Sequence, residues 1–497
     1  MTSEFEPVIG LEVHVELSTR TKAFCGCPAT FGAPPNTQVC PVCLGLPGSL
    51  PVLNLKAVEY AIRAALALGC QVARVCKFDR KNYFYPDLPK SYQISQYDLP
   101  LATGGAVEFL TPGGRKRVGI RRLHLEEDTG KLLHEGVESG SLVDFNRCGV
   151  PLLEIVSEPE LASPEDARLY LTALRSLIQF TGVSDCRMER GSLRCDANVS
   201  LRPRGSREWG ALVEVKNMNS FRSVKAALEF EVSRQARVLS AGGRVARETR
   251  HWDEARGVTF PSRSKEEAHD YRYFPEPDLP PLRIEPEWVE EIRAGLPELP
   301  EARRRRLVSG LGLPEYNAWV LTSSPALARL FDETLRLYPD PREVSNWVMG
   351  DVLRVLNARR LELEESKLTA EGLAGMLRLI DRGLISGRAA KALLEALVVD
   401  GGEPARLVEE LGLTQVSDPA ALAGVVREVV AQNPSTVADY LSGKEKALTF
   451  LMGQVMKRTS GRANPEVAAR LLRDAMAGEG RAGSGAGPDS GGEAGGR

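Results

Sequence analysis

The chain has 497 residues, of which 43% are hydrophobic and 26% charged, and its formal net charge is −2. This length predicts two to four domains, and the near-neutral charge excludes a protein that grips a polyanion over its whole surface. We find no apolar run of the ~18 to 20 residues that a membrane helix needs, and no signal-peptide pattern in MTSEFEPVIG. Nine cysteines without an export signal favour reduced thiols or metal ligands, so we expect a cytoplasmic protein with no membrane partner.

The first predicted element is the strand LEVHVEL, residues 11–17, in which apolar and polar residues alternate without a break. Because side chains of a strand point alternately to opposite faces, Glu12, His14 and Glu16 share one face. Two interpretations follow from this strand alone. The polar face is either a solvated face of an antiparallel sheet or part of a cation site.

The next segment carries two pairs of cysteines around a loop rich in glycine and proline. Its pattern is Cys25-x-Cys27, twelve further residues, then Cys40-x-x-Cys43. A tetrahedral four-thiolate zinc site needs two such close pairs. The spacing therefore predicts a closed, structural zinc knuckle over residues 24–44, and the alternative is four unrelated buried cysteines.

Aromatic residues and cations then alternate in KFDRKNYFYPDLPKSYQISQYD, from residue 77. Aromatic faces such as those of Tyr83 and Tyr85 stack on bases or on a sugar, and lysines such as Lys81 contact phosphates. The alternative is ordinary packing of half-buried tyrosines in a loop.

Three later segments, IRRLHLEED, LRCDANVSLR and ALVEVKNMN, alternate like the first strand. Their polar faces carry His124, Glu126, Arg194, Asp196, Glu214 and Lys216. If the strands line one cleft, their carboxylates repel one another unless a cation lies between them. Carboxylates with an imidazole favour Mg²⁺ or Mn²⁺, and the basic side chains would balance the charge of a triphosphate.

Helices interrupt these strands. Ser163-Pro164-Glu165-Asp166 predicts a helix start, with an end near Gly182, and a second helix begins after Ser220. The proline-dense segment from Asp270 predicts extended chain and then a linker. Beyond about residue 300, apolar residues recur with the helical period, which predicts a helical domain that breaks at Gly401-Gly402.

A further helical unit and a Gly/Ser-rich end complete the chain. The unit carries cations at Lys444, Lys446, Lys457, Arg458 and Arg462. A helix is predicted to end near residue 461 and the next to start at an Asn-Pro pair, which places free backbone N–H groups beside these cations. That arrangement suits a phosphate backbone, and the alternative is a solvated helix face.

Some motifs are missing from the sequence. There is no GxxxxGK[ST] phosphate loop, no GxSxG elbow and no Ser-Ser-Lys amidase signature. If the chain binds a nucleotide, another scaffold must hold it.

Seven motifs in order closely resemble those of one family: VIGLEVHVEL, FDRKNYFYPDLPKSYQISQYD, LHLEEDTGK, DFNRCGVPLLEIVSEPE, GSLRCDANVSLR, VKNMNSF and DYRYFPEPD. The family is the B subunit of the aspartyl/glutamyl-tRNA(Asn/Gln) amidotransferase (GatB). The resemblance covers about residues 6 to 475, and the chain keeps all four zinc cysteines, unlike some members.

The resemblance implies an α+β protein. It implies a strand-rich, cradle-like catalytic domain with the zinc knuckle over residues 1–293, a helical domain over 294–402 and a helical YqeY-like tail domain over 403–477. Residues 478–497 are predicted to form a disordered tail. The resemblance also implies a complex with two further proteins of the amidotransferase, an amidase (the A subunit) and a small protein (the C subunit).

The implied reaction is ATP-dependent. With Mg-ATP, the family phosphorylates the side-chain carboxylate of Glu misacylated on tRNA(Gln), or of Asp on tRNA(Asn). Ammonia that the partner amidase frees from glutamine then displaces the phosphate, which fits the missing amidase signature. Which of the two tRNAs is the substrate, and whether the metal is Mg²⁺ or Mn²⁺, the sequence leaves open.

The resemblance assigns roles to the polar residues found above. We expect Glu12, His14 and Glu126 to bind Mg²⁺, and Glu127, on the opposite strand face, to be a weaker candidate. Phosphate contacts are expected from Lys81, Arg194 and Lys216, with Asp196 and Glu214 supporting them or binding a second metal. Tyr83 and Tyr85 would flank the terminal adenosine or the misacylated side chain, and the cations of the tail domain would hold the outer body of the tRNA.

Two rival functions also fit parts of the sequence. A non-catalytic zinc-bearing RNA-binding protein needs the knuckle and basic patches, but not the carboxylates and imidazole of the first strand. A stand-alone ATP-dependent ligase that uses free ammonia needs the carboxylates, but no partner amidase.

Overall fold

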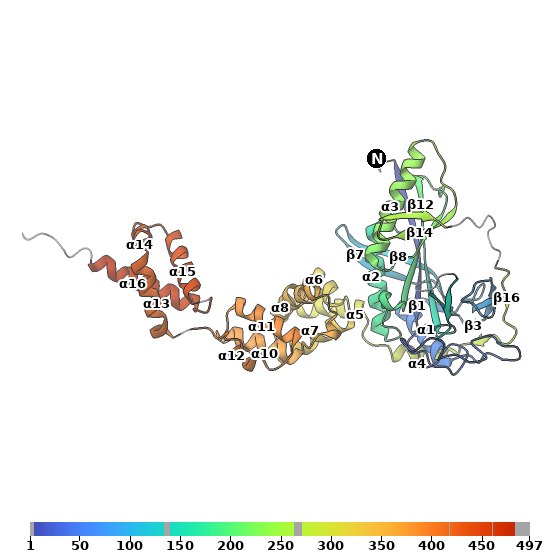
Figure 1. Ribbon diagram of the computed structural model, residues 1–497, viewed down its shortest axis with the longest axis horizontal. Helices are drawn as coiled ribbons and strands as arrows, with labels where there is room; N and C mark the ends of the chain where they lie inside the picture. The colour runs from blue at the N-terminus through green and yellow to red at the C-terminus, as the bar shows by residue number, and fades with distance from the viewer. Residues whose placement is uncertain (1–3, 134–139, 263–270, 417, 460, 483–497) are drawn as a thin grey trace, which may run out of the picture. The chain divides into compact units, whose positions relative to one another are not determined.

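A computed structural model (Figure 1) describes residues 4–133, 140–262, 271–416, 418–459 and 461–482. The chain divides into two compact units, Met1–Gly310 with Thr322–Pro325, and Leu311–Leu321 with Ala326–Arg497. The first is rich in strands and the second is helical, which confirms the predicted α+β class. Among the described residues, no helix is both long and apolar enough to cross a bilayer.

The strands all lie in the first unit. They are β1 (Phe5–Glu16), β2 (Gln71–Val72), β3 (Val75–Cys76), β4 (Asp79–Asn82), β5 (Tyr92–Ser95), β6 (Ala102–Thr103), β7 (Ala106–Thr111), β8 (Gly114–Glu127), β9 (Lys131–Leu133), β10 (Leu142–Asp144), β11 (Pro151–Ser157), β12 (Leu193–Pro203), β13 (Val213–Lys216), β14 (Glu248–Asp253), β15 (Val258–Pro261), β16 (Phe274–Pro275) and β17 (Leu282–Arg283).

One long mixed sheet dominates this unit. Its order is β15-β14-β13-β12-β1-β11-β8-β6-β2, with β7 paired to β8, and only β13 and β14 run parallel. Small sheets β16-β4-β5, β17-β3 and β10-β9 accompany it. The alternating strand β1 is therefore central, with β12 on one side and β11 on the other.

The helices and helical turns follow in chain order. They are α1 (Leu55–Ala67), α2 (Pro164–Thr181), η1 (Met188–Arg190), α3 (Phe221–Ser240), α4 (Pro286–Ala294), α5 (Pro300–Arg305), η2 (Arg306–Gly310), α6 (Glu315–Leu321), α7 (Pro325–Leu337), α8 (Pro341–Trp347), η3 (Val348–Val352), α9 (Leu353–Arg359), η4 (Leu363–Glu365), α10 (Ala370–Asp381), α11 (Gly387–Val399), α12 (Pro404–Glu410), α13 (Pro419–Gln432), α14 (Pro434–Leu441), α15 (Lys446–Arg458) and α16 (Pro465–Ala482).

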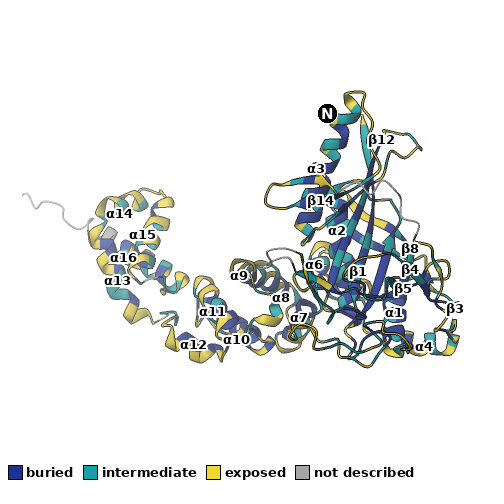
Figure 2. Ribbon diagram, turned by 45° about the vertical axis from the view of Figure 1, so that its right-hand side comes forward, coloured by how far each residue is buried: buried dark blue, intermediate teal, exposed yellow. Residues whose placement is uncertain are grey.

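The alternation of β1 separates a core face from a site face. Leu11, Val13 and Val15 are buried in one hydrophobic core together with residues of α1, α2 and α3. Figure 2 shows this burial along the central strands. Because the helices cover the apolar face, the polar residues of the same strands gather on the other face, as alternation requires.

The predicted helix boundaries in this unit are confirmed, with one correction. The Ser163 hydroxyl accepts from Asp166 N–H at the start of α2, and Gly182 ends it with φ 73°. Ser220 caps α3 in the same way. However, α4 begins at Pro286, inside the segment that we expected to be extended. A proline fits the first turn of a helix because its N–H is not needed there.

The helical unit breaks where the sequence predicts. Helix α11 ends at Val399, and Gly401 and Gly402 follow with φ 69° and 109°, a conformation that suits glycine. Helices α13 to α16 enclose a separate small core. Helix α16 continues through Ala482, beyond the predicted domain end at 477, and the rest of the predicted disordered tail lies outside the described residues. The three-domain division remains a prediction.

Candidate active site

The strand register brings four polar side chains into one row across the sheet. Opposite His14 of β1 lie Arg194 of β12 and Glu154 of β11, and opposite Glu154 lies His124 of β8. Glu126 follows on the same face of β8 as His124. The predicted convergence of β1, β8 and β12 therefore occurs, and β11, between β1 and β8, adds a carboxylate that we did not predict.

Three of these residues form a compact set of ligand atoms. One ligand atom each of His14, Glu126 and Glu154 lies within 4.8 Å of the other two. His14 Nε2 is 3.6 Å from Glu154 and 3.8 Å from Glu126. Both carboxylates are buried, and the His14 side chain is 20% exposed, so the set opens to solvent through the imidazole. Two carboxylate oxygens and one imidazole nitrogen suit Mg²⁺ or Mn²⁺.

His124 lies behind this set and supports both carboxylates. Its Nε2 is 3.1 Å from Glu154 and 3.6 Å from Glu126, and its side chain is only 2% exposed. Ser95 Oγ also donates to Glu126 at 3.0 Å. Groups that hold ligands from behind fix their orientation, so the site is preorganised by the sheet.

Opposing charges shift the pKa values in this cluster. Burial alone would lower the pKa of His124, but Glu154 and Glu126 outweigh it and raise the pKa to about 9. Burial likewise opposes the pKa shift of Glu154, which the two imidazoles hold well below its usual range. The cluster thus favours ionised carboxylates, which is the form that binds a cation.

Glu12, the third predicted magnesium ligand, lies outside the compact set of three ligand atoms. Its carboxylate accepts a hydrogen bond of 2.8 Å from Asn198 Nδ2. Burial and the charge of Glu154 raise its pKa. Glu12 lies two residues before His14 in β1 and therefore on the same face of the sheet.

The predicted phosphate-binding cations are present but held by carboxylates. Lys216 Nζ lies 2.7 Å from Asp196 and 2.9 Å from Glu214. Arg194 pairs with the buried Asp128. These pairs place the cations on the site face, and a phosphate would have to compete with the carboxylates or join them.

Lys81 lies among aromatic rings at the edge of the site. Its Nζ is 4.9 Å from the ring centre of Tyr271 and 5.8 Å from that of Tyr83. Tyr273 lies 6.0 Å from Tyr271, edge to face. Burial opposes the shift, but Glu126, Tyr273 and Glu154 raise the pKa of Lys81, so the ammonium keeps its charge beside the carboxylates. Tyr85, by contrast, is 51% exposed.

Sequence reasoning missed Glu154, Tyr271 and Tyr273. Glu154 is the lone charged residue in the strand PLLEIVS, and a single acid in an otherwise uncharged central strand was the available signal. The two tyrosines lie at the start of the proline-dense segment that we interpreted as extended chain followed by a linker, without a role in the site. Strand β16, which follows them, pairs with β4 and so brings them next to Lys81.

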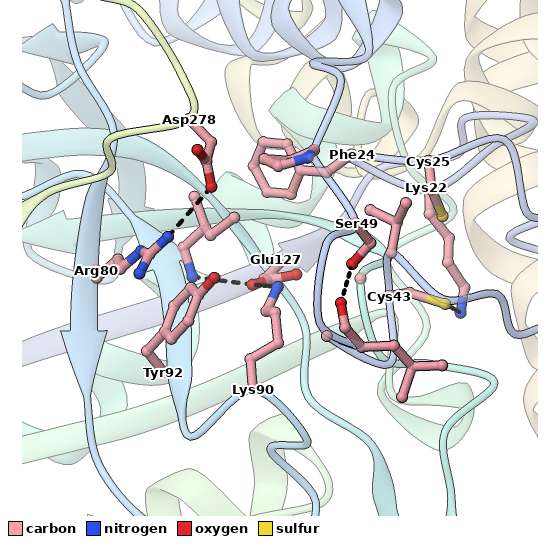
Figure 3. Close-up of a pocket in the computed structure, with 16 residues that line it drawn as sticks. Lys22, Phe24, Cys25, Cys43, Ser49, Arg80, Lys90, Tyr92, Glu127 and Asp278 are labelled. Atoms are coloured by element: carbon pink, nitrogen blue, oxygen red, sulfur yellow. Dashed lines mark hydrogen bonds and ion pairs between the residues drawn. The ribbon is translucent and has the colours of Figure 1, made fainter.

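The four predicted zinc cysteines converge as well. Their sulfur atoms all lie within 4.8 Å of one another. Hydrogen bonds from the Cys25 thiol and the Cys40 N–H, against the effect of burial, lower the pKa of Cys43 to about 4. Four converging thiols, one of which favours the thiolate form, suit a tetrahedral zinc ion. Cys25, Cys43 and Glu127 line a cavity of about 190 Å³. Figure 3 draws the residues that line it.

Glu127 is confirmed on the opposite strand face from Glu126. Its carboxylate accepts from Ile94 N–H at 2.9 Å and pairs with Lys90. It therefore does not contribute to the compact set with His14.

The predicted cations of the tail domain differ in whether they form ion pairs. Lys444 pairs with Asp439 at 2.8 Å, and Arg458 pairs with Glu428 at 2.6 Å. In the described residues no ion pair involves Lys446, Lys457 or Arg462, although Arg462 Nε donates to Thr459 O at 3.4 Å. Asn464 accepts from Glu466 N–H at the start of α16, as predicted.

The geometry gathers carboxylates and imidazoles on one face of the sheet, in a set of ligand atoms that could hold a cation. Comparisons with known proteins agree with the sequence motifs. Residues 7–290 match the family model of the GatB/GatE catalytic domain, and residues 329–476 match that of the GatB domain. The chain is 59% identical over 477 residues to the B subunit of the aspartyl/glutamyl-tRNA(Asn/Gln) amidotransferase of Carboxydothermus hydrogenoformans, covering 95% of this chain and 99% of that protein. It is 58% identical over 475 residues to the protein of the same name from Moorella thermoacetica, covering 95% and 100%.

A third relative with this name, from Brevibacillus brevis, is 56% identical over 474 residues, which cover 95% of this chain and 99% of that protein. The chain belongs to the GatB family of tRNA amidotransferase subunits. The family resemblance carried by the sequence motifs is thereby confirmed.

Proposed function

We propose that this chain activates and amidates the side-chain carboxylate of Glu on tRNA(Gln), of Asp on tRNA(Asn), or of both. The observation that carries the proposal is the convergence of His14, Glu126 and Glu154 on the site face of the sheet. A solvated sheet face has no reason to bury two carboxylates against two imidazoles, because unpaired buried charges are costly.

The donor set fits Mg²⁺, with His14, Glu126 and Glu154 as ligands and Glu12 beside them. When bound, Mg²⁺ would neutralise charge on the phosphate oxygens of ATP and so lower the cost of bringing a carboxylate to them. This revises the ligand set that we expected from sequence, because Glu154 takes the position that we gave to Glu12.

The chain's other residues supply position and charge. The substrate carboxylate attacks the γ-phosphorus and ADP leaves, which produces an acyl phosphate. Lys81 can stabilise the transferred phosphoryl group directly, and Lys216 and Arg194 can do so if their carboxylate partners shift. The rings of Tyr83, Tyr271 and Tyr273 offer faces for the terminal adenosine or the misacylated side chain.

Amidation completes the reaction. Ammonia attacks the carbonyl carbon of the acyl phosphate, inorganic phosphate leaves, and a proton passes to solvent or to a site carboxylate. Because the sequence lacks an amidase signature, a partner amidase, the A subunit, must supply the ammonia from glutamine. The small C subunit is the third expected member of the complex.

The four-cysteine cluster has a separate, structural role in this proposal. Cys25, Cys27, Cys40 and Cys43 would hold one zinc ion with no ligand position left for a substrate. The tail domain would hold the tRNA body through its cations.

A reconstituted complex tests the proposal. The purified chain with both partner proteins is given ATP and either misacylated tRNA, and ADP and amidated tRNA are measured. We expect ADP formation that requires Mg²⁺ and the misacylated tRNA. Binding of tRNA without ATP consumption would instead support the non-catalytic RNA-binding alternative.

Omitting the partner amidase tests the second rival function, a stand-alone ligase that needs no partner amidase. Amidation with glutamine should then stop, whereas amidation with ammonium salt should continue. If glutamine still supports amidation by the chain alone, the proposed division of labour is wrong.

A further inference from the structure

Lys22 is completely buried, yet no carboxylate balances its charge. Its relative exposure is 0%, and within the described residues no carboxylate oxygen forms an ion pair with its Nζ. Burying an ammonium without an opposite charge costs several kcal/mol, so such a residue needs another anion.

The contacts of Lys22 identify the anion. Its Nζ donates to Cys43 Sγ at 3.6 Å and to the Phe145 carbonyl at 3.3 Å, and Figure 3 shows the side chain ending beside the Cys43 sulfur. Its backbone N–H also donates to the Cys27 carbonyl at 3.0 Å. Lys22 thus contacts both cysteine pairs. Among the described residues, the side chain that its ammonium contacts is that of Cys43, whose sulfur becomes an anion when it binds a metal.

Full burial and close packing hold the Lys22 side chain. Gly149 has φ 86°, and a Cβ built there would make ordinary van der Waals contacts, 3.4 Å to Cys43 Cβ and 3.5 Å to Lys22 Cδ. The lysine stem and Cys43 therefore both pack against Gly149. A side chain fixed in this way presents its charge to the sulfur without an entropic cost at the time of metal binding.

A second lysine of the same cavity, Lys90, whose side chain is 7% exposed, provides a comparison. Lys90 also lines the cavity, but it pairs with Glu127. The charge of Lys90 is therefore balanced by a carboxylate, whereas the Nζ of Lys22 contacts the sulfur of Cys43.

We infer that Lys22 is the buried counter-charge of the cysteine cluster, a positioning residue that strengthens metal binding through Cys43. This inference rests on the proposal that the four cysteines bind zinc. Zinc with four thiolates carries a net charge of −2, and the ammonium reduces it to −1 beside Cys43, the buried member of the cluster. The hydrogen bond to Phe145 also links the cluster to the chain segment that leads into β11.

Zinc affinity of the full chain tests the inference, with Lys22→Met as the neutral variant of similar length and Lys90→Met as the matched control. Competition with a chromophoric chelator measures the affinity. Loss of a partner that orients a metal ligand typically weakens metal binding about 10- to 100-fold, so we expect this for Lys22→Met and wild-type affinity for Lys90→Met.

The outcomes are distinguishable. If wild type and Lys22→Met bind zinc equally well, Lys22 is not the counter-charge and the zinc proposal stands. If wild type binds no zinc, both proposals are overturned. If both methionine variants lose affinity equally, the effect belongs to the cavity as a whole and the inference is wrong.

A spectroscopic readout separates a charge effect from loss of fold. In the cobalt-substituted chain, the sulfur-to-cobalt charge-transfer band reports the electron density on the thiolates. Removing a hydrogen bond to Cys43 Sγ raises that density, so we expect the band of Lys22→Met to move to longer wavelength. The band of Lys90→Met should not move, and an unmoved band in Lys22→Met would overturn the inference.

Discussion

The two candidate metal clusters of this chain are built in opposite ways. The four cysteines lie within nineteen positions of one another, 25 to 43, in a segment where the described backbone forms turns and a bridge but no regular strand. His14, Glu126 and Glu154 come from three strands of one sheet and are separated by as many as 140 positions. One cluster is local in sequence, and the other exists only through long-range strand pairing.

This difference predicts which cluster depends on its metal. The cysteine segment buries few large apolar side chains, and Phe31, Leu46 and Leu50 in or beside it are 49% to 70% exposed. A segment with so little core needs the metal to be ordered. The carboxylate cluster, in contrast, is fixed by a sheet whose other face is a hydrophobic core, so it should persist without metal.

The largest expected effect is the loss of a cysteine ligand. Structural zinc contributes about 10 to 16 kcal/mol of apparent binding free energy in small zinc domains, so Cys40→Ser should cost at least ~4 kcal/mol of stability in this unit. Metal analysis should fall from one zinc per chain to none, and limited proteolysis should cut residues 24–44. Cys76→Ser, at a buried cysteine outside the cluster, should keep its zinc. A stable, protease-resistant Cys40→Ser chain would show that the segment does not need metal.

The second effect concerns catalysis. Glu154→Gln and Glu126→Gln each remove a charge from the compact set, and we expect amidation to fall at least ~100-fold, which corresponds to about 2 to 3 kcal/mol of barrier. Melting temperature should also fall, because both carboxylates balance the buried His124, but the fold should be retained, since the hydrophobic core on the other face holds the sheet. Single-turnover rates with misacylated tRNA measure this, and the glutaminase activity of the partner should remain.

Glu12→Gln is the informative comparison for those variants. Glu12 lies outside the compact set and has Asn198 as a partner, so its loss should reduce the rate less than the loss of Glu154. If Glu12→Gln reduces the amidation rate as much as Glu154→Gln does, or more, the result supports the magnesium ligand set predicted from the sequence, which includes Glu12.

The same contrast explains what the sequence could reveal. Spacing alone identified Cys25, Cys27, Cys40 and Cys43, because residues close together in the sequence determine the geometry of a local loop. Alternation identified the faces of β1 and β8. Register is different: which residue lies opposite His14 depends on turns and pairing far along the chain, so Glu154 could not be placed from β11 alone.

Two other differences have the same origin. The sequence indicated cations near the site, but it did not indicate that Asp128 would pair with Arg194. Asp128 follows β8 and Arg194 lies in β12, and these two strands are not neighbours in the sheet. Tyr271 lies in a proline-rich segment whose short strand β16 forms only against β4. Local sequence propensity indicated neither the Asp128–Arg194 ion pair nor strand β16.

The third prediction is a pH dependence of the carboxylate cluster. His124 has a pKa of about 9 in the folded chain, against about 6.5 in the unfolded chain. A raised pKa stabilises the fold below pH ~6.5, and this stability is lost as the pH rises through 9. In magnesium-free buffer, with zinc bound, unfolding free energy should fall by roughly 3 kcal/mol across this range.

Urea denaturation at a series of pH values measures the slope of the unfolding free energy against pH. His124→Asn should flatten it relative to wild type, because an asparagine does not titrate. Added Mg²⁺ should flatten it too, since a bound cation would replace the proton as the charge between the carboxylates. An unchanged slope in His124→Asn would mean that other groups titrate with folding.

The smallest effects are expected in the tail domain, whose described residues contain neither cluster. Deletion from residue 405 onward should raise the KM for misacylated tRNA several-fold and flatten its salt dependence, while the glutaminase activity of the complex remains. Single charges should matter less, about two- to fivefold in KM, because each phosphate contact is one of several.

Within the tail, the ion pairs rank the single variants. Lys444 is engaged by Asp439, whereas no ion pair involves Lys457 in the part of the chain that the structure describes. Lys457→Ala should therefore raise the KM more than Lys444→Ala and reduce the slope of log affinity against log salt by about one. Because neither lysine lies in a metal cluster, the rate at saturating tRNA should not change. A fall in that rate with unchanged KM would give the tail domain a role in the chemical step. Equal KM values for the deletion variant and wild type would rule out a role of the tail domain in tRNA binding.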